Sequence, residues 1–379
     1  MNFQFTKEQE LVKQMVSEFA ENEVKPIAAE VDANHRFPME NVEKMAQYGL
    51  FGIPFSAEYE GAGGDYLSYI LAVEELSKKC ATTGVILSAH VSLCASVIDQ
   101  FGNPEQKKKY LPDLCSGRKL GAFGLTEPNA GTDAAGQQTV AVKDGDNYIL
   151  NGQKIFITNG AYAETFIVFA MTDKSKGTKG ITAFIVEKDF PGFSIGKVED
   201  KLGICGSSTT ELIFEDCVVP AENMLGKEGR GFGIAMKTLD GGRIGIASQA
   251  LGIAGGALEE AVAYMKERKQ FGKQLFKFQG LAWMAADCKA RLEAARYLVY
   301  KAADNKGKGL PYTVEAATAK LFAADTAMFV TTQCVQMLGG YGFTKDYPLE
   351  RMMRDAKITE IYEGTSQVQK MVISGDMFR

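Results

Sequence analysis

The chain has 379 residues, of which 46% are hydrophobic and 23% charged, as in ordinary globular proteins. This length is enough for two or three packed units rather than one. A formal net charge of −5, with lysine and arginine scattered along the chain, argues against a nucleic-acid-binding surface. We see no run of about eighteen apolar residues and therefore expect no segment that spans a membrane.

Cysteine and histidine usage narrows the chemistry further. The seven cysteines are an odd number without a C-x-x-C pair, which argues against a disulfide framework and a structural zinc site. They are expected to be small buried side chains in a reducing cytoplasm. Of the two histidines, His35 and His90, the second lies in an apolar run and is expected to be packed rather than catalytic. The early charged residues predict no signal peptide.

The first third of the chain has helical signals. Thr6 and Gln9 have the spacing of a capping box, and apolar residues follow on one face. Pro26 is expected to interrupt or bend this segment. A second helix is expected between Pro38 and Gly49. Three more are expected over residues 68–79, 82–101 and 104–114.

From residue 121 to about residue 226 the signals change to β. Residues 144–147 read Asp-Gly-Asp-Asn between two apolar runs, which predicts a hairpin. Short strands are expected after it, separated by Gly, Asn and Asp, over residues 154–158, 165–171, 181–186 and 211–214.

The helical period returns after residue 226 and continues to the end. Alanine-rich faces in this part suit close helix packing, and four long antiparallel helices would make a bundle. The helices are expected over residues 233–269, 278–305, 312–338 and 350–373. The sequence therefore predicts an α+β multidomain protein with an N-terminal α-helical domain (1–120), a β domain (121–226) and a C-terminal helical domain (227–379).

Two common nucleotide-binding motifs do not occur. The glycines of residues 61–64 fail the G-x-G-x-x-G pattern, and every Gly-Lys pair is followed by a residue other than Ser or Thr. The sequence therefore lacks the usual evidence for a dinucleotide bound on a Rossmann sheet and for a nucleotide bound by a P-loop. A bound cofactor would need another kind of site.

Two segments beside the predicted strands offer polar groups to a ligand. Residues 123–133 (FGLTEPNAGTD) carry small and hydroxylated residues whose N–H and O–H groups suit a ring or a phosphate. Residues 156–160 (FITNG) place an aromatic ring next to a hydroxyl, which suits a flat heterocycle. Ordinary turns would explain both segments equally well.

Three further segments fall in the helical C-terminal part. Gly241 and Gly242, between Asp240 and Arg243, weaken a helix by roughly 1 kcal/mol each relative to alanine. Either another group approaches the backbone there, or the helix is interrupted, and Asp240 with Arg243 could be only a helix-face pair. Arg268, before Phe271-Gly272, could cap a helix or reach a pyrophosphate. Residues 336–342 end a helix with glycines that leave room for a ligand.

The last segment, residues 361–367 (IYEGTSQ), contains a candidate general base. Glu363 lies between Tyr362 and Gly364 in an apolar region, so its carboxylate would be partly desolvated. Desolvation raises a carboxyl pKa toward the range that a general base needs. A solvated glutamate on a helix surface is the plainer alternative.

Together these segments resemble the acyl-CoA dehydrogenase family over essentially the whole chain. One motif alone would be weak, whereas all of them in the family's order are highly specific. The resemblance is strongest to the short-chain, butyryl-CoA branch of anaerobic, clostridial-type bacteria. It implies an N-terminal α-helical domain, a middle β-barrel and a C-terminal four-helix bundle, assembled as a homotetramer (a dimer of dimers).

The resemblance also implies FAD, held noncovalently between barrel and bundle, and no metal. Residues 268, 279 and 336–340 would reach the FAD of a neighbouring subunit. Acyl-CoA would contact Thr132, Asp240, Arg243 and Gly364. The implied cofactor-binding residues are Phe123, Leu125, Thr126, Thr132, Phe156, Ile157, Thr158, Arg268, Gln279, Gln336, Leu338, Gly339, Gly340, Thr365, Ser366 and Gln367.

The implied reaction removes the α-proton of an acyl-CoA thioester with Glu363 and passes the β-hydride to flavin N5. In the family, the thioester oxygen accepts hydrogen bonds from a flavin ribityl hydroxyl and from the N–H of the catalytic glutamate. Branches with the base on the earlier helix carry it where this chain has Gly242, so Glu363 is expected to be the only base. The same site can oxidise butyryl-CoA or reduce crotonyl-CoA.

An electron-transferring flavoprotein is the implied partner of a cytoplasmic enzyme. The alternatives are an acyl-CoA oxidase, although such chains are usually much longer, and a non-catalytic flavoprotein subunit, which would be favoured by loss of Glu363. Two positions depart from the family: Phe156 replaces a frequent tryptophan and remains aromatic, and Cys205 stands where close relatives carry a basic residue.

Overall fold

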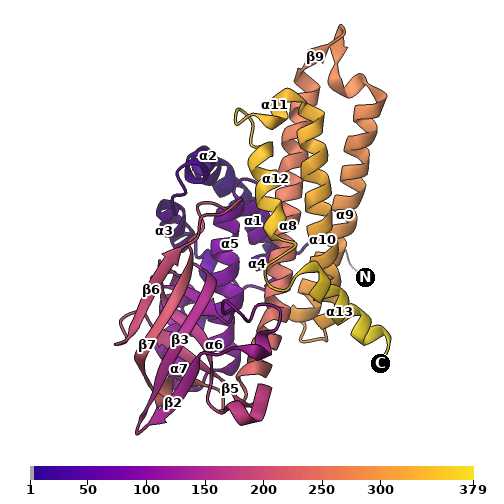
Figure 1. Ribbon diagram of the computed structural model, residues 1–379. Coiled ribbons are helices and arrows are strands. Elements are labelled where there is room, and N and C mark those ends of the chain that lie inside the picture. The colour runs from indigo at the N-terminus through magenta and orange to yellow at the C-terminus, as the bar shows by residue number, and fades with distance from the viewer. Residues whose placement is uncertain (1–3) are drawn as a thin grey trace.

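The structure is a computed structural model in which residues 4–379 are described. N-terminal helices and a β-sheet lie together, and a group of long helices extends away from them (Figure 1). The expected fold class, with a helical N-terminal part, a β middle part and a helical C-terminal part, is confirmed.

The first helices begin and bend where the sequence predicts. The Thr6 hydroxyl accepts a hydrogen bond from the Gln9 N–H (3.2 Å), and the Gln9 side chain accepts one from the Thr6 N–H (2.9 Å). This confirms the capping box. Pro26 lies in the first turn of a new α-helix that follows a π-helical turn, so the expected interruption is present. The elements are α1 (Lys7–Phe19), η1 (Ala20–Val24), α2 (Lys25–Ala33) and α3 (Met39–Gln47).

The following helices form the core of the N-terminal part. The helix expected over residues 82–101 is divided by a π-helical turn. Contrary to our expectation, Ala81–Phe101 is long and apolar enough to cross a membrane, but its most apolar stretch is entirely buried, as in a core helix. The elements are α4 (Tyr66–Ser77), α5 (Ala81–Ala89), η4 (His90–Ala95), α6 (Ser96–Phe101) and α7 (Pro104–Ser116).

His90 joins the N-terminal helices to the sheet. Its Nδ1 accepts a hydrogen bond from the Gly121 N–H (3.0 Å), and its Nε2 lies 2.9 Å from the Leu114 carbonyl oxygen. The proton of the neutral ring therefore sits on Nε2. The side chain is fully buried, and this burial lowers its pKa to about 4. The expectation of a packed, structural histidine is confirmed.

The middle part is an eight-stranded sheet in the order β6-β7-β3-β2-β4-β5-β8, with β1 paired to β4 in parallel. The predicted hairpin at residues 144–147 joins β2 to β3 and is confirmed. The strands are β1 (Leu120–Gly124), β2 (Val140–Asp144), β3 (Asn147–Thr158), β4 (Ala163–Met171), β5 (Ile181–Glu187), β6 (Phe193–Val198), β7 (Thr209–Pro220) and β8 (Met224–Leu225).

Two features of the sheet differ from the sequence prediction. The separate strand expected at residues 154–158 is the second half of β3, which continues through two irregularities in its pairing with β7. Strands β1 and β6 and the two-residue β8 were not predicted. β1 contains two glycines in five residues, and β6 is only partly covered, so neither has a clear apolar alternation.

The C-terminal part is built on long helices. Alanines on the facing surfaces of α8 and α10 are buried, as the sequence predicts. The single helix expected over residues 350–373 is wrong, because the chain breaks between α12 and α13. The elements are α8 (Gly231–Glu267), β9 (Lys269–Gln270), β10 (Lys273–Gln274), α9 (Gln279–Gly307), α10 (Thr313–Leu338), α11 (Gly340–Phe343), α12 (Leu349–Ile358) and α13 (Ser366–Met377).

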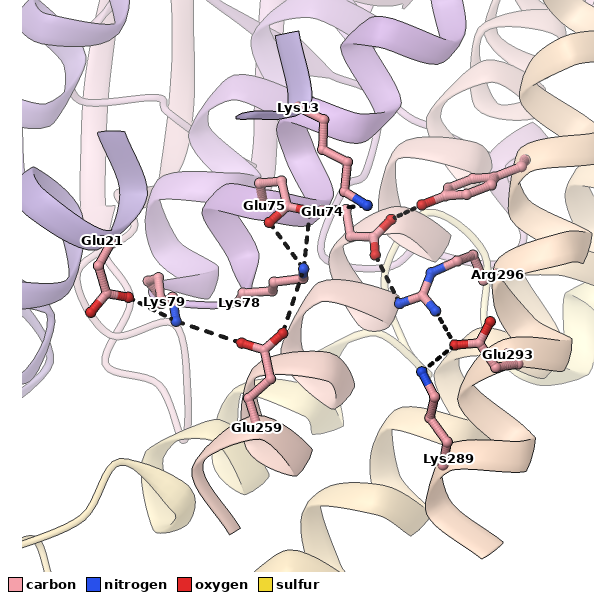
Figure 2. Close-up of polar contacts among 11 residues, drawn as sticks. Lys13, Glu21, Glu74, Glu75, Lys78, Lys79, Glu259, Lys289, Glu293 and Arg296 are labelled. Carbon is pink, nitrogen blue, oxygen red and sulfur yellow. Dashed lines mark hydrogen bonds and ion pairs between the residues drawn. The ribbon is translucent and has the colours of Figure 1, made fainter. Parts of the chain in front are cut away.

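A charged network fastens α4 to the C-terminal helices (Figure 2). Glu74 is fully buried and accepts hydrogen bonds from Tyr300 (2.6 Å) and Arg296 (3.3 Å) of α9. Next to it, Lys78 lies 3.0 Å from Glu75 and 3.6 Å from Glu259 of α8. These contacts fix the N-terminal helices relative to α8, the helix that carries Gly242.

Candidate active site

The break between α12 and α13 presents Glu363. Glu363 has a φ of +52° and Gly364 one of +92°, so the backbone turns left-handed at both positions. Such a conformation is unfavourable for a residue with a side chain and is typical of functional sites. The turn lies between the end of α12 at Ile358 and the start of α13 at Ser366, so the Glu363 side chain belongs to neither helix.

Buried side chains hold this turn from three helices. Lys320 of α10 and Gln369 of α13 each donate a hydrogen bond to the Gly364 carbonyl oxygen, both at 2.8 Å. The Tyr362 hydroxyl donates to Gln249 of α8, whose amide nitrogen donates in turn to a backbone carbonyl of α5 (3.0 Å). The strained turn is therefore fixed by its surroundings.

The Glu363 carboxylate lies directly against Gly242. A Cβ atom at residue 242 would overlap Glu363 Oε2 and would lie 2.8 Å from Leu93 Cδ2. The helix α8 is continuous here, so the two glycines do not interrupt it. Of the two alternatives that the sequence left open, the close approach of another group is the correct one. Gly241 is approached in the same way by Lys306 Nζ.

The environment of Glu363 suits proton transfer near neutral pH. Oε2 is buried and has no hydrogen-bond partner in the described part of the chain. Burial raises the pKa of Glu363 to about 7, while the positive charges of Lys320 and Arg243 oppose the rise. An unpaired carboxylate with such a pKa can accept a proton, and the plainer alternative of a solvated glutamate is not what the structure contains.

Arg243 is near enough to this carboxylate for its charge to act on it, and it also contacts Asp240. Arg243 donates to Asp240 (2.5 Å), which also accepts a hydrogen bond from the Thr313 hydroxyl (2.7 Å). All three line a cavity of about 460 Å³ between α8, α10 and α13. The helix-face pair weighed from the sequence is thus present, and it forms part of a cavity wall.

The sequence-predicted residues of the sheet are held by a buried ion pair. Lys154 donates to Glu127 (2.7 Å), and Glu127 also accepts from the N–H groups of residues 138 and 139. This fixes the loop that carries Thr126. Phe156 has a φ of +62° and leaves its ring 60% exposed, whereas Leu125 and Ile157 are buried. Phe123 and Thr158 are half-buried, and Thr132 is exposed.

Other predicted residues lie far along the helices from Glu363. Arg268, Gln279, Gln336, Gly339 and Gly340 are exposed near β9 and α11, at the end of the bundle away from α13 (Figure 1). The Arg268 guanidinium lies 5.6 Å from the centre of the Tyr341 ring. Leu338 is buried. Within one chain the structure does not bring these residues to the candidate base.

The remaining predicted residues form the first turn of α13. The Thr365 hydroxyl caps the helix by accepting a hydrogen bond from the Val368 N–H (3.3 Å). Ser366 is buried, and its hydroxyl has no hydrogen-bond partner in the described chain. Gln367 is exposed. A helix N-terminus with a free hydroxyl suits an anionic group.

Comparison with known proteins identifies the family. Models of the N-terminal, middle and C-terminal domains of acyl-CoA dehydrogenase match residues 6–118, 122–217 and 229–378. The chain is 74% identical over 379 residues to the short-chain specific acyl-CoA dehydrogenase of Clostridium acetobutylicum, and the alignment covers 100% of both chains. The chain belongs to the acyl-CoA dehydrogenase family.

Solved structures of the family agree closely with this acyl-CoA dehydrogenase. Butyryl-CoA dehydrogenase from Megasphaera elsdenii is 57% identical, with a TM-score of 0.99 and 100% of both chains covered. A chain solved in work on the electron transferring flavoprotein of Acidaminococcus fermentans is 60% identical, with the same score and coverage. An acyl-CoA dehydrogenase from Bacillus anthracis, 35% identical over 99% of this chain and 68% of its own (TM-score 0.93), was solved with FAD.

Sequence reasoning missed several residues around the candidate base of this acyl-CoA dehydrogenase. Gln249, Lys320 and Gln369 are fully buried and hold the turn at Glu363, yet none lies in a recognisable motif. One signal was available for Lys320, a lone charge in the apolar alanine-rich run of α10. In the described chain, no three His, Cys, Asp or Glu side chains are grouped to hold a metal.

Cys205, the second departure from the family pattern, lies where three parts of the acyl-CoA dehydrogenase meet. Its thiol is 3.3 Å from the Lys201 carbonyl oxygen and 3.9 Å from Arg354 of α12. Arg354 is itself paired with Asp32 of α2 (2.6 Å). All seven cysteines are buried and free, so the expectation of buried thiols is confirmed.

Proposed function

We propose that this member of the family is an FAD-dependent short-chain acyl-CoA dehydrogenase that interconverts butyryl-CoA and crotonyl-CoA in the cytoplasm, with Glu363 as its base. The observation that carries the proposal is the buried Oε2 atom of Glu363, which has no hydrogen-bond partner among the described residues and lies against Gly242. The names of the relatives from Clostridium acetobutylicum and Megasphaera elsdenii support the substrate class.

The residues around Glu363 have separate tasks in this proposal. The carboxylate takes the α-proton of the thioester. No hydrogen bond between described residues uses the Glu363 N–H, so this N–H remains free to donate to the thioester oxygen, on which negative charge develops. Gly242 has no side chain, so no second base stands at that position and the Glu363 carboxylate has room to lie there.

The residues that the chain offers fit FAD. A ring could stack on the exposed Phe156, and an anionic diphosphate could lie at the first turn of α13 near the unpaired Ser366 hydroxyl. Phe123, Thr126 and Thr158 would line the same cofactor. FAD, when bound, would supply the acceptor for the β-hydride. Asp240, Arg243, Thr132 and Gly364 would position the acyl-CoA.

Residues at the far end of the bundle support an assembly. We propose that Arg268, Gln279, Gln336, Gly339 and Gly340 reach the FAD of a neighbouring subunit in a homotetramer, because one chain holds them away from its own Glu363. Leu338 would contribute through its backbone. An electron-transferring flavoprotein is the proposed redox partner, supported by the relative solved in work on such a flavoprotein.

The test is an anaerobic titration of the purified yellow protein, first with butyryl-CoA and then with octanoyl-CoA, monitored by flavin absorbance. We expect bleaching by butyryl-CoA and a much weaker response to octanoyl-CoA. A protein with bound FAD that neither thioester bleaches would overturn the proposed substrate. Reoxidation of the bleached protein by air at the rate of turnover would instead identify an acyl-CoA oxidase.

A further inference from the structure

Lys320 is a buried ammonium group without a carboxylate in contact. Its side chain is fully buried in α10, and its one hydrogen bond in the described chain goes to the Gly364 carbonyl oxygen at 2.8 Å. No ion pair within 4.0 Å joins it to an acidic side chain of the described chain. Burying an unpaired charge is costly, and such groups are concentrated at functional sites.

Several titratable groups around Glu363 are either paired or neutral. Arg243 of α8 is paired with Asp240 (2.5 Å), so much of its charge is already balanced. From α4, Tyr66 and Tyr69 face the carboxylate, and burial raises the pKa of both phenols, which stay neutral. Tyr362, next in the chain, is neutral for the same reason. Glu360 and Asp325 act on Lys320 through space without contacting it, and the buried Lys306 of α9 approaches Gly241 but is not among the charges that shift the pKa of Glu363. Among the described residues, Lys320 is therefore the cation near the candidate base that contacts no carboxylate.

We propose that Lys320 is a positioning residue for the catalytic turn: its ammonium group holds the Gly364 carbonyl, and its charge keeps the buried Glu363 carboxylate ionised and ready to accept a proton. The inference rests on the proposed role of Glu363 and assigns a role to a residue outside every motif. Burial alone would drive the carboxyl toward its neutral form, which cannot act as a base.

The pKa values of the two groups agree with this arrangement. Burial lowers the pKa of Lys320 to about 8, and Glu363 is the charge that most opposes this fall. Lys320 is in turn the charge that most opposes the rise of the Glu363 pKa. At neutral pH each group therefore favours the ionised form of the other, although they do not touch.

Two substitutions separate the charge of Lys320 from its hydrogen bond. Lys320→Met removes both, whereas Lys320→Gln removes the charge and keeps an N–H donor for the Gly364 carbonyl. The protonation of Glu363 is read without substrate, from the infrared band of its carboxylic acid against pH, with the spectrum of Glu363→Gln subtracted. The rate of flavin bleaching by butyryl-CoA against pH is the second readout.

We expect both variants to raise the midpoint of the Glu363 titration by about one unit or more, as removal of a nearby opposite charge does. Lys320→Gln should regain most of the wild-type bleaching rate at high pH, and Lys320→Met should remain about tenfold or more below it, because its catalytic turn is loosened. Lys301→Met, which changes an exposed lysine of α9, should alter neither readout.

If the infrared midpoint of Glu363 is unchanged in Lys320→Gln, the proposal is wrong. This test uses Lys320→Gln alone, so it can still be made if Lys320→Met fails to fold. If the bleaching rate of a Lys320 variant is lowered by the same factor at every pH and its Glu363 titration keeps the wild-type midpoint, Lys320 has only a structural role. That result would also overturn the proposal. Because the infrared titration needs no substrate, its result stands even if the proposed butyryl-CoA activity fails.

Discussion

At the scale of single residues, the properties that suit Glu363 to proton transfer also make it costly for folding. Its carboxyl is held in a left-handed turn, and burial raises its pKa from 4.5 to about 7. The folded chain therefore binds this proton more tightly than the unfolded chain does. The contribution of this group to stability falls as the pH rises from about 4.5 to 7, and the cost is complete above pH 7.

Replacing the proposed base should therefore stabilise the protein at alkaline pH. Glu363→Gln keeps the shape and removes the ionisation, so we expect a gain of about 1–3 kcal/mol in the free energy of unfolding at pH 8. The gain should shrink toward zero near pH 4.5. Denaturant unfolding at the two pH values measures it, and a variant less stable than the wild type at pH 8 would contradict the assigned environment.

Substitution of Gly242 should lower activity as strongly as substitution of the proposed base. In Gly242→Ala the new methyl group would overlap Glu363 Oε2, so the carboxylate has to move. We expect butyryl-CoA turnover to fall about 100-fold or more while the helix remains folded. Gly255→Ala is the matched control on the same helix, because its Cβ meets only atoms at 3.7 Å or beyond. Equal activity of the two variants in a steady-state assay would refute the close contact.

Motif reasoning reached Glu363 and Gly242 because their neighbours in the chain carry the signal. It did not reach Lys320, Gln249 or Gln369. Lys320 and Gln249 lie on helices more than 40 positions away in the chain, and Gln369 lies on the helix that follows the turn. What places them at the turn is the packing of α8 and α10, which no local pattern encodes. Contacts between residues far apart in the sequence could be identified only from the three-dimensional structure.

At the scale of elements, prediction succeeded where hydrogen bonds are local. The capping box of α1 and the hairpin between β2 and β3 depend on residues three or four apart, and both are confirmed. The predicted helix over residues 350–373 failed because its periodicity continues through Glu363. The chain turns left-handed at Gly364, which has a φ of +92°, and a new helix starts at the Thr365 cap, while tertiary contacts hold the Gly364 carbonyl.

The π-helical turn η4 shows how an element responds to the protein around it. His90 begins this turn, and both of its ring nitrogens form hydrogen bonds with backbone groups, one of which is in β1. The same turn carries Leu93 to Gly242. A widened turn in a long helix often lies at a functional site, and here it lies between the sheet and the candidate base.

His90 should make the fold sensitive to acid. Its pKa is lowered from 6.5 to about 4, so the unfolded chain takes up the proton first. Stability from this group is complete above pH 6.5 and falls as the pH drops toward 4, by about 3 kcal/mol. The free energy of unfolding in His90→Gln should change less with pH in this window. Identical slopes for wild type and variant would show that His90 is not the responsible group.

At the scale of the whole molecule, charges join the N-terminal helices to the bundle. Glu74 is buried and depends on Arg296 and Tyr300 of α9 (Figure 2). The sequence predicted the helices and their order but not this junction, since the partners are more than 200 positions apart. The buried carboxylate is stable there only while its partners remain.

Loss of one partner should weaken the whole fold. Arg296→Met leaves Glu74 buried with Tyr300 alone, and we expect a loss of about 3 kcal/mol in the free energy of unfolding. Lys289→Met is the control, because it removes an exposed pair with Glu293 and should cost less than about 1 kcal/mol. Thermal or denaturant unfolding compares them, and similar losses in both would argue against a stabilising junction.

The central claim is that Glu363 removes the substrate α-proton, and one measurement tests it most directly. Wild type and Glu363→Gln, each purified with FAD, are mixed anaerobically with butyryl-CoA in a stopped-flow instrument, and flavin bleaching is followed from pH 5.5 to 9. We predict that the wild-type rate rises with pH through about 7, as the carboxylate forms, and that the variant is slower by about 10³-fold or more at every pH. Bleaching of the variant at the wild-type rate would contradict the account.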